Sequence, residues 1–479
     1  MAPVRPLLTV SLLCLLALAG CMQPKDAPAA GGLPTTVPEA TTEIARLVET
    51  AGKVAMTFTQ SVVTPAKGLG SDLYEPTMEV SDTGTLYVAA HVIGAATTGT
   101  PAYYSNDDGA TWKVLPMAGP VAVPSPGQGS QPPPGDEGFI VAGDGGQAWM
   151  ADIYAAGFSV TGWCDDGARE CYDNRYAYDR VQSTTTSCGD GARPDQGTTA
   201  ASLNDRPWAA YAKGTLLLVN NPGGGPMQIG VMKVPPATPV GLFDPVTGPK
   251  WNLCASPDGW IPGVPAMRPD LFFAVPQIAG SGADQRLTIV TGNAASIGTT
   301  QVRDAFPVTS ASGGTSNGGR TAFDATGTLF VGAYNNTKAD AKDGKSGHFI
   351  LATSTDSGGS FRNVTFATTS PLQSLYLDSN LKGAGALLTW SQVGSTEGRA
   401  DWYVAHVFVG PNGEPELRNV NLAVDEGSPY SAHVMGAAVG PDGRAYFVNF
   451  KDASDPLQYA GSTPLSVWVQ QDGPTLPVA

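Results

Sequence analysis

Three arginines, Arg206, Arg268 and Arg320, each stand at the beginning of a short apolar segment that is predicted to be a β-strand. A guanidinium group presents its N–H donors as a planar fork, which matches the two oxygens of a carboxylate. If the three segments converge in the fold, these side chains can hold the carboxylate of a ligand together. The alternative, which the sequence leaves open, is that Arg206 pairs with Asp205 and Arg268 with Asp270 as structural ion pairs.

Other polar residues take the same position at the start of predicted strands. They are Glu75, Glu137, Asp205, Asp270 and His433. Tyr334 ends a neighbouring strand and is expected at the same edge. These residues lie far apart in the sequence, so only a fold that gathers the beginnings of many strands in one place makes a site from them.

A repeated unit supplies such strands. Each copy has a short apolar strand, an Asp/Gly turn and a second strand of aromatic and β-branched residues, with alternating polarity. The clearest copies cover residues 75–91, 319–334 and 433–450, and weaker ones cover 137–154, 205–221, 270–292 and 372–392. From Gly84 to Gly443 there are six intervals, of about 60 residues each. This length predicts an all-β fold, a single β-propeller of four-stranded blades over residues 41–479, with seven blades preferred and six as the alternative.

Two of the copies continue into a sharper motif, Ser-x-Asp-x-Gly-x-[Thr/Ser]-[Trp/Phe]. It comprises Ser105, Asp107, Gly109 and Trp112 after the first copy, and Ser354, Asp356, Gly358 and Phe361 after the fifth. In such a turn the aspartate accepts backbone N–H bonds, the glycine permits a positive φ and the aromatic ring covers the hairpin. We therefore interpret both aspartates as structural residues, although their carboxylates look like catalytic ones.

This motif is the Asp box of the BNR repeat, and the chain resembles the sialidase-like, BNR-repeat propeller superfamily over most of residues 54–479. The resemblance implies that ligands bind at the central top face, away from the Asp boxes. Two features depart from the family pattern. Sialidases carry a Phe/Tyr-Arg-Ile-Pro segment before the first Asp box, and nothing like it occurs between Cys21 and Ser105. Sialidases also have six blades.

Two functions follow from the resemblance. In the first, the propeller binds a carbohydrate or protein ligand on the cell surface without a reaction, with ligand contacts from Arg206, Arg268, Arg320, Asp205, Asp270 and His433. In the second, it is an exo-α-sialidase or a related glycoside hydrolase, with Tyr334 as nucleophile, Glu75 or Glu137 to activate it, and the arginines on the substrate carboxylate. The four histidines are isolated and no phosphate-binding loop occurs, so we expect no cofactor and no metal.

The N-terminus predicts export. Arg5 precedes an apolar stretch, residues 7–18, that is too short to span a bilayer as a mature helix. Residues 18–21, Leu-Ala-Gly-Cys, resemble the lipobox of prokaryotic lipoproteins, which implies cleavage before Cys21 and acylation of its thiol. The alternative is an ordinary secretory signal with an incidental cysteine. Residues 1–21 are thus expected to be signal peptide and lipobox, and residues 22–40 a flexible tether to the cell membrane or outer membrane, on its extracytoplasmic side.

The composition agrees with an exported β-protein. Only 14% of the 479 residues are charged, and the 42% that are hydrophobic suffice for a large core. The net charge of −15 argues against nucleic acid as a partner, because phosphate binding needs a basic face. We expect a monomer that touches the membrane only through its lipid.

The last repeat lacks its fourth strand. Its third strand is predicted at Leu465–Gln470, and Pro474 and Pro477 oppose another strand after it. Residues 54–63 alternate as a strand but precede the first unit. We predict that this segment supplies the outer strand of the last blade and thereby closes the ring. A short helix with Ile44, Leu47, Val48 and Ala51 on its apolar face would lead into it.

Four cysteines lie outside the signal segment and predict two disulfides. They are Cys164, Cys171, Cys188 and Cys254. Cys164–Cys171 with Cys188–Cys254 is the preferred pairing of three, and it would fasten a long insertion expected over residues 163–202. Mass spectrometry of non-reduced peptides should recover both bonds, and four free thiols would contradict the prediction.

Overall fold

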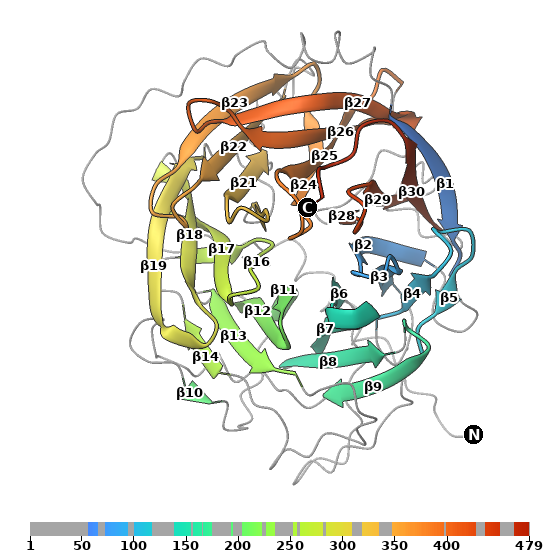
Figure 1. Cartoon of the computed structure of the whole chain (residues 1–479), viewed down its shortest axis with the longest axis horizontal. Coiled ribbons are helices and arrows are strands. Elements are labelled where there is room, and N and C mark those ends of the chain that lie inside the picture. Colours follow the sequence, from blue (N-terminus) through green and yellow to red (C-terminus); the bar gives the residue numbers. More distant parts are fainter. Residues whose placement is uncertain are drawn as a thin grey trace, which may run out of the picture. The chain divides into compact units, whose positions relative to one another are not determined.

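The structure, a computed structural model, consists of antiparallel sheets arranged in a ring (Figure 1). It describes residues 56–65, 72–93, 100–116, 138–154, 157–164, 166–174, 193–194, 204–222, 227–234, 252–255, 259–280, 284–308, 319–334, 347–396, 399–427, 436–450 and 464–478. All of these belong to one of the two units of the chain, Pro38–Ala479. The expected signal peptide, tether and helix lie outside the described residues. No helix within the described part is long and apolar enough to cross a membrane.

Seven sheets form the blades of a β-propeller, which confirms the preferred number. Blade 1 consists of β2 (Asp72–Val80), β3 (Leu86–Ile93), β4 (Ala102–Ser105) and β5 (Lys113–Val114). Blade 2 consists of β6 (Gly138–Ala142), the 3-10 turn η1 (Asp144–Gly146), β7 (Ala148–Tyr154), β8 (Gly157–Cys164) and β9 (Arg169–Asn174). Blade 3 consists of β11 (Asn204–Ala212), β12 (Thr215–Pro222), β13 (Gln228–Lys233), β14 (Asn252–Ala255) and β10 (Arg193–Pro194). Blade 4 consists of β15 (Gly259–Pro262) and β16 (Ala266–Met267), both paired with β17 (Phe272–Ala279), then β18 (Arg286–Asn293) and β19 (Ser296–Pro307). Blade 5 consists of β20 (Arg320–Phe323), β21 (Leu329–Tyr334), β22 (Gly347–Ser354) and β23 (Arg362–Thr368). Blade 6 consists of β24 (Leu372–Asp378), β25 (Ala386–Val393), β26 (Ala400–Val409) and β27 (Pro415–Gly427). Blade 7 consists of β28 (Gly436–Val439), β29 (Ala445–Phe450), β30 (Leu465–Asp472) and β1 (Thr57–Val63).

The turns between the first two strands of a blade join it to the next blade. In blade 5, Asp324 Oδ1 accepts the backbone N–H groups of Thr326 (2.9 Å) and Thr328 (3.0 Å), and Gly327 takes a φ of +83° that this turn requires. The other oxygen, Oδ2, accepts the N–H of Gly385 in blade 6 at 3.0 Å. The aspartates of these repeated turns are therefore structural.

Aromatic side chains fill the space between neighbouring blades. Trp390 of blade 6 stacks on Tyr403 with ring centroids 5.0 Å apart and also packs against Phe349 of blade 5. Between blades 6 and 7, Trp402 stacks on Phe447 at 6.0 Å. Because each blade is covered on both faces, its inner strands are buried along nearly their whole length, as β21 is at all six residues.

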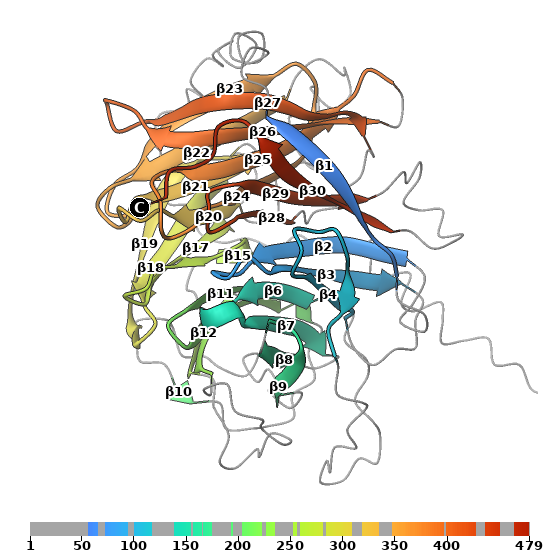
Figure 2. The same cartoon turned by 45° about the vertical axis from the view of Figure 1, so that its right-hand side comes forward.

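The ring closes as the sequence predicted. Strand β1 pairs antiparallel with β30 over its whole length, from Thr57 opposite Asp472 to Val63 opposite Leu465 (Figure 2). Phe58 of β1 packs edge-on against Phe447 at 5.5 Å. The N-terminal strand thus completes the blade that the C-terminal strands begin.

Strand β1 is also fixed to both blades that neighbour blade 7. Trp112 of blade 1 donates from Nε1 to Ser61 Oγ at 2.8 Å, and the Ser61 hydroxyl donates to the carbonyl of Gly109. On the other side, Asn421 of blade 6 donates to the carbonyl of Met56 at 3.0 Å. One strand therefore ties three blades together.

The expected insertion over residues 163–202 is wrong in its first part. Residues 157–164 and 169–174 form the third and fourth strands of blade 2, although they lack long apolar runs. Their hairpin carries the predicted Cys164–Cys171 disulfide, which is confirmed. Cys188 lies outside the described residues, so its pairing with Cys254 stays a prediction.

Removing β1 should destabilise the whole ring, because the edge of β30 and the contacts to blades 1 and 6 are lost together. We expect a chain that begins at Gly70 to melt well below one that begins at Pro38. Differential scanning calorimetry of the two proteins measures this difference. Equal melting temperatures would contradict closure by β1.

Candidate functional site

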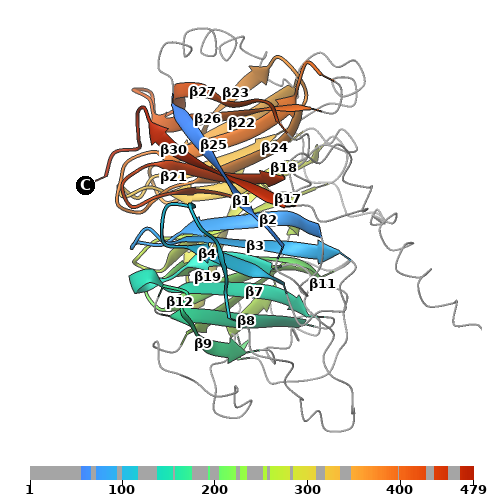
Figure 3. The ribbon, with the colours of Figure 1, turned by 90° about the vertical axis from the view of Figure 1, so that its right-hand side faces the viewer.

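The two ends of the propeller are built differently. At the Asp-box end, where the first strand of each blade finishes, connections are mostly short, such as the two residues between β11 and β12. At the opposite end, which we call the loop end, the chain between strands is longer, as over residues 115–137, 335–346 and 451–464. Side-on, the blades show their strands running from one of these ends to the other (Figure 3). A ligand site in such a fold is expected among the longer connections.

Both Asp boxes have the geometry that the motif predicts. Asp356 accepts bonds from the Ser354 hydroxyl (2.7 Å), the Ser360 N–H (2.9 Å) and the Ser360 hydroxyl (2.7 Å). Asp107 makes the same set with Ser105 and Thr111. These hydrogen bonds lower the pKa of each carboxyl to about 2. Each carboxylate thus makes these hydrogen bonds within its own turn.

The residue after the Asp-box aspartate reaches back to the preceding blade. Asp108 forms an ion pair with Arg444 of blade 7 at 2.6 Å. At the same place Ser357 accepts a bond from Arg268 of blade 4 at 3.2 Å. Asp108 and Ser357 both have a φ of +59°, which aims them out of their own turn. This contact occurs at both Asp boxes and belongs to the Asp-box end.

The expected position of Arg268 and Asp270 at the start of an innermost strand is therefore wrong. They lie in the turn between β16 and β17, because β15 and β16 form the first strand of blade 4 and β17 the second. Arg268 binds Asp270 with two nitrogens, at 3.1 and 2.6 Å, and stacks over Phe272 at 4.7 Å. The ion-pair alternative holds for these two residues, at the end away from the loops.

Arg320 occupies the expected place, at the start of β20 on the loop end. Its side chain is buried, with its guanidinium 5.5 Å from the ring centre of Tyr376 on blade 6 and Nη1 donating to the carbonyl of Gly319 at 2.9 Å. Tyr334 is also buried, and the charge of Arg320 partly offsets the rise that burial causes in the phenol pKa. The structure thus gathers one cation and two phenols where blades 5 and 6 meet.

Glu75 lies elsewhere, in blade 1, which is not a neighbour of the blade of Tyr334. It sits at an irregularity of the β2–β3 pairing, with a φ of +45°, a strained conformation for glutamate. Its Oε2 lies 3.9 Å from His91 Nδ1. Among the described residues no hydrogen bond joins a carboxylate to Tyr334.

The remaining predicted residues are placed in part or not at all. Asp205 and Arg206 lie near the start of β11, at the loop end as expected, but only their backbone is described. Glu137 and His433 lie outside the described residues. Arg320 and Arg206 therefore remain candidates for holding the carboxylate of a ligand, and Arg268 does not.

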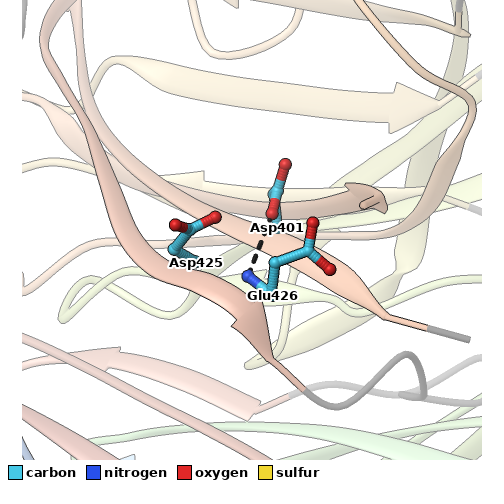
Figure 4. Close-up of side chains that lie close together, drawn as sticks. All are labelled: Asp401, Asp425 and Glu426. Carbon is cyan, nitrogen blue, oxygen red and sulfur yellow. Dashed lines mark hydrogen bonds between the residues drawn. The ribbon is translucent and has the colours of Figure 1, made fainter. Parts of the chain in front are cut away.

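One acidic cluster at the loop end of blade 6 is not predicted from the sequence. Asp401 is the second residue of β26, and Asp425 and Glu426 directly precede Gly427, the last residue of β27. Their carboxylate oxygens lie within 4.8 Å of one another (Figure 4). Asp401 accepts the N–H of Glu426 at 3.1 Å, and its pKa is raised, first by burial and then by the charges of the other two. In the sequence, this cluster is indicated only by the adjacent acids Asp425 and Glu426. Bonds within the hairpin explain the arrangement, so we assign no ligand to it.

Comparison with known proteins gives structural likenesses at low identity. No protein-family model and no curated protein sequence matches the chain. The endosialidase of phage phi92 is similar with a TM-score of 0.45 and 12% identity, covering 88% of this chain and 70% of its own. A leech intramolecular trans-sialidase gives 0.41 and 12%, covering 85% and 68%. An α-L-arabinofuranosidase of Fusarium graminearum gives 0.39 and 11%, covering 71% and 92%. The chain's own sheets and turns define a seven-bladed β-propeller with Asp boxes.

The Asp356 carboxylate should stabilise the fold in a pH-dependent way. Its pKa lies below that of an unfolded aspartate, so its contribution is present above pH 4 and is lost as the pH falls toward 2. We expect Asp356→Asn to cost about 1 kcal/mol at pH 7, because the turn is solvent-exposed. Urea unfolding at pH 7 and pH 2.5 measures this, and an equal deficit at both values would contradict it.

Proposed function

We propose that this chain is an exported, lipid-anchored propeller of the sialidase-like, Asp-box type that binds a ligand on the cell surface at its loop end. A glycan with an acidic group is the ligand that the site suits best, with a protein as the other candidate. The observation that carries this proposal is Arg320, a buried guanidinium held over Tyr376 and beside Tyr334 where the innermost strand of blade 5 begins.

The chemistry of these three residues fits an acidic sugar. The guanidinium fork matches a carboxylate, and aromatic rings pack against the apolar face of a sugar ring. Burial strengthens the attraction between the guanidinium and an anion, since little water competes with it. Because Arg320 is only 1% exposed, the side chains around it must shift to admit the ligand. Arg206, near the start of the innermost strand of blade 3, would approach the same end of the ring.

Glycoside hydrolysis of the sialidase type is the second candidate, with Tyr334 as nucleophile. A tyrosine nucleophile needs a neighbouring base or a lowered pKa, whereas burial raises the pKa of Tyr334. Glu75 lies in a blade that is not a neighbour. The described geometry therefore favours binding over catalysis.

Replacing the guanidinium should weaken binding selectively. We expect Arg320→Lys to lower the affinity for acidic glycans on a glycan array at least tenfold, because a lysine loses the two-point contact with a carboxylate. Arg268→Lys is the matched control, since Arg268 is also stacked on aromatic rings but lies at the Asp-box end. Equal binding by both variants and the wild type would overturn the assignment of Arg320.

A fluorogenic sialoside separates the two candidate functions. The binding proposal predicts no turnover by the exported chain. Turnover that disappears in Tyr334→Phe and in Arg320→Lys, with both variants folded by calorimetry, would replace it with the hydrolase.

A further inference from the structure

Two carboxyl groups occupy equivalent positions in blades on either side of blade 7. Glu79 in β2 pairs with Tyr87, and Asp378 in β24 pairs with Leu387, in each case the second residue of the next strand. The equivalent residue of β28, which lies between them in the ring, is Ala438. A small residue thus separates two acids at the same level of the propeller.

The other blades have no acid at this level. Their equivalent residues, each opposite the second residue of the next strand, are Val141, Tyr211, Met267 and Ala322. The two acids are therefore not a feature of the repeat, and they are confined to the blades that flank the ring closure.

Backbone contacts tie both carboxyl groups to this region. Asp378 Oδ2 accepts the N–H of Val439, at the end of β28, with a distance of 3.0 Å. Glu79 Oε1 accepts the N–H of Val80 at 3.3 Å. On the Glu79 side β28 lies directly on β2, since a Cβ at Gly436 would meet the backbone nitrogen of Met78. Asp378 thus holds the closing blade directly, and Glu79 lies on the strand against which it packs.

Glu79 and Asp378 each keep part of their surface exposed, but the surrounding blades enclose enough of both side chains to make charge costly. Burial raises the pKa of Asp378 to about 6. Burial, and next the charge of Asp378, raise the pKa of Glu79 well above its usual value. Two ionised carboxylates at these positions would repel each other.

Other titratable groups also lie on the neighbouring strands. They are Arg320 on β20, Tyr334 on β21, Tyr376 on β24, Glu75 on β2, Tyr87 and His91 on β3, and Tyr446 on β29. Burial raises the pKa of the phenols of Tyr334, Tyr376, Tyr87 and Tyr446, which therefore stay neutral near pH 7. Arg320 keeps its charge throughout this range. Glu75 and His91 face each other four positions further toward the loop end.

We propose that Glu79 and Asp378 form a proton-holding pair that makes the packing of blade 7 against blades 1 and 6 depend on pH. This packing is most stable in mild acid and becomes less stable as the pair loses its last proton.

The sign of the effect follows from proton counting. In the unfolded chain both carboxyls ionise near pH 4, whereas the folded pair holds a proton to about pH 6 or above. Between these values the folded protein binds more protons, so its stability falls as the pH rises. His406, whose pKa burial lowers to about 4, acts in the opposite direction, and it is present in every variant below.

Urea unfolding of the full chain between pH 4.5 and pH 8 tests the pair. We expect Asp378→Asn and Glu79→Gln each to be more stable than the wild type at pH 8, with the difference vanishing near pH 4.5. Asparagine keeps an acceptor for the Val439 N–H. Glu416→Gln, which removes an exposed acid paired with Arg418, is the control and should run parallel to the wild type. If the stability of both Asp378→Asn and Glu79→Gln changes with pH in parallel with that of the wild type, the proposal is overturned.

Hydrogen exchange locates the effect. After correction for the intrinsic rate, wild-type peptides from β28, β29 and β30 should exchange faster at pH 8 than at pH 5, and those from β11 to β13 should not. Asp378→Asn should suppress that increase. An increase spread evenly over all blades, or one that the variant retains, would overturn the link to blade 7. If Asp378→Asn does not fold, Glu79→Gln carries both measurements.

Discussion

The pairing of β1 with β30 is the contact that makes the other blades possible. Blades bury their apolar faces against each other, so blades 1, 6 and 7 keep their cores only while blade 7 is complete. Among the described residues, no disulfide joins β1 to the other strands of blade 7. Strand pairing, the Trp112–Ser61 and Asn421–Met56 bonds and the Asp108–Arg444 ion pair share this task.

At the Asp-box end, the polar side chains described above make structural hydrogen bonds and ion pairs. Asp107 and Asp356 bond within their own turns, Asp324 bonds to the next blade, and Arg268 bonds to Asp270 and Ser357. Acids and arginines that look catalytic in the sequence are structural there. Arg320 stands with Tyr334 and Tyr376 at the opposite, loop end, where blades 5 and 6 meet.

The parts of the site that the sequence placed correctly lie in repeats with one continuous first strand. Arg320 and Tyr334 belong to such a repeat, with a single tight turn between the two strands. Arg268 does not, because residues 262–265, Pro-Gly-Val-Pro, interrupt the first strand of blade 4. The apolar run that follows has the pattern of a first strand, but it forms the second. A proline-broken strand has no clear period, so this register was invisible in the sequence.

The sequence by itself determined the propeller, its seven blades, the Asp-box turns, the Cys164–Cys171 bond and the strand that closes the ring. These features depend on local turn chemistry and on alternating polarity, which neighbouring residues encode. Only the tertiary structure decided which polar groups meet, because contacts such as Arg320 over Tyr376 or Asp378 on Val439 join different blades. Their partners are set by the order and register of the blades around the ring, and no pattern within a single repeat carries that information.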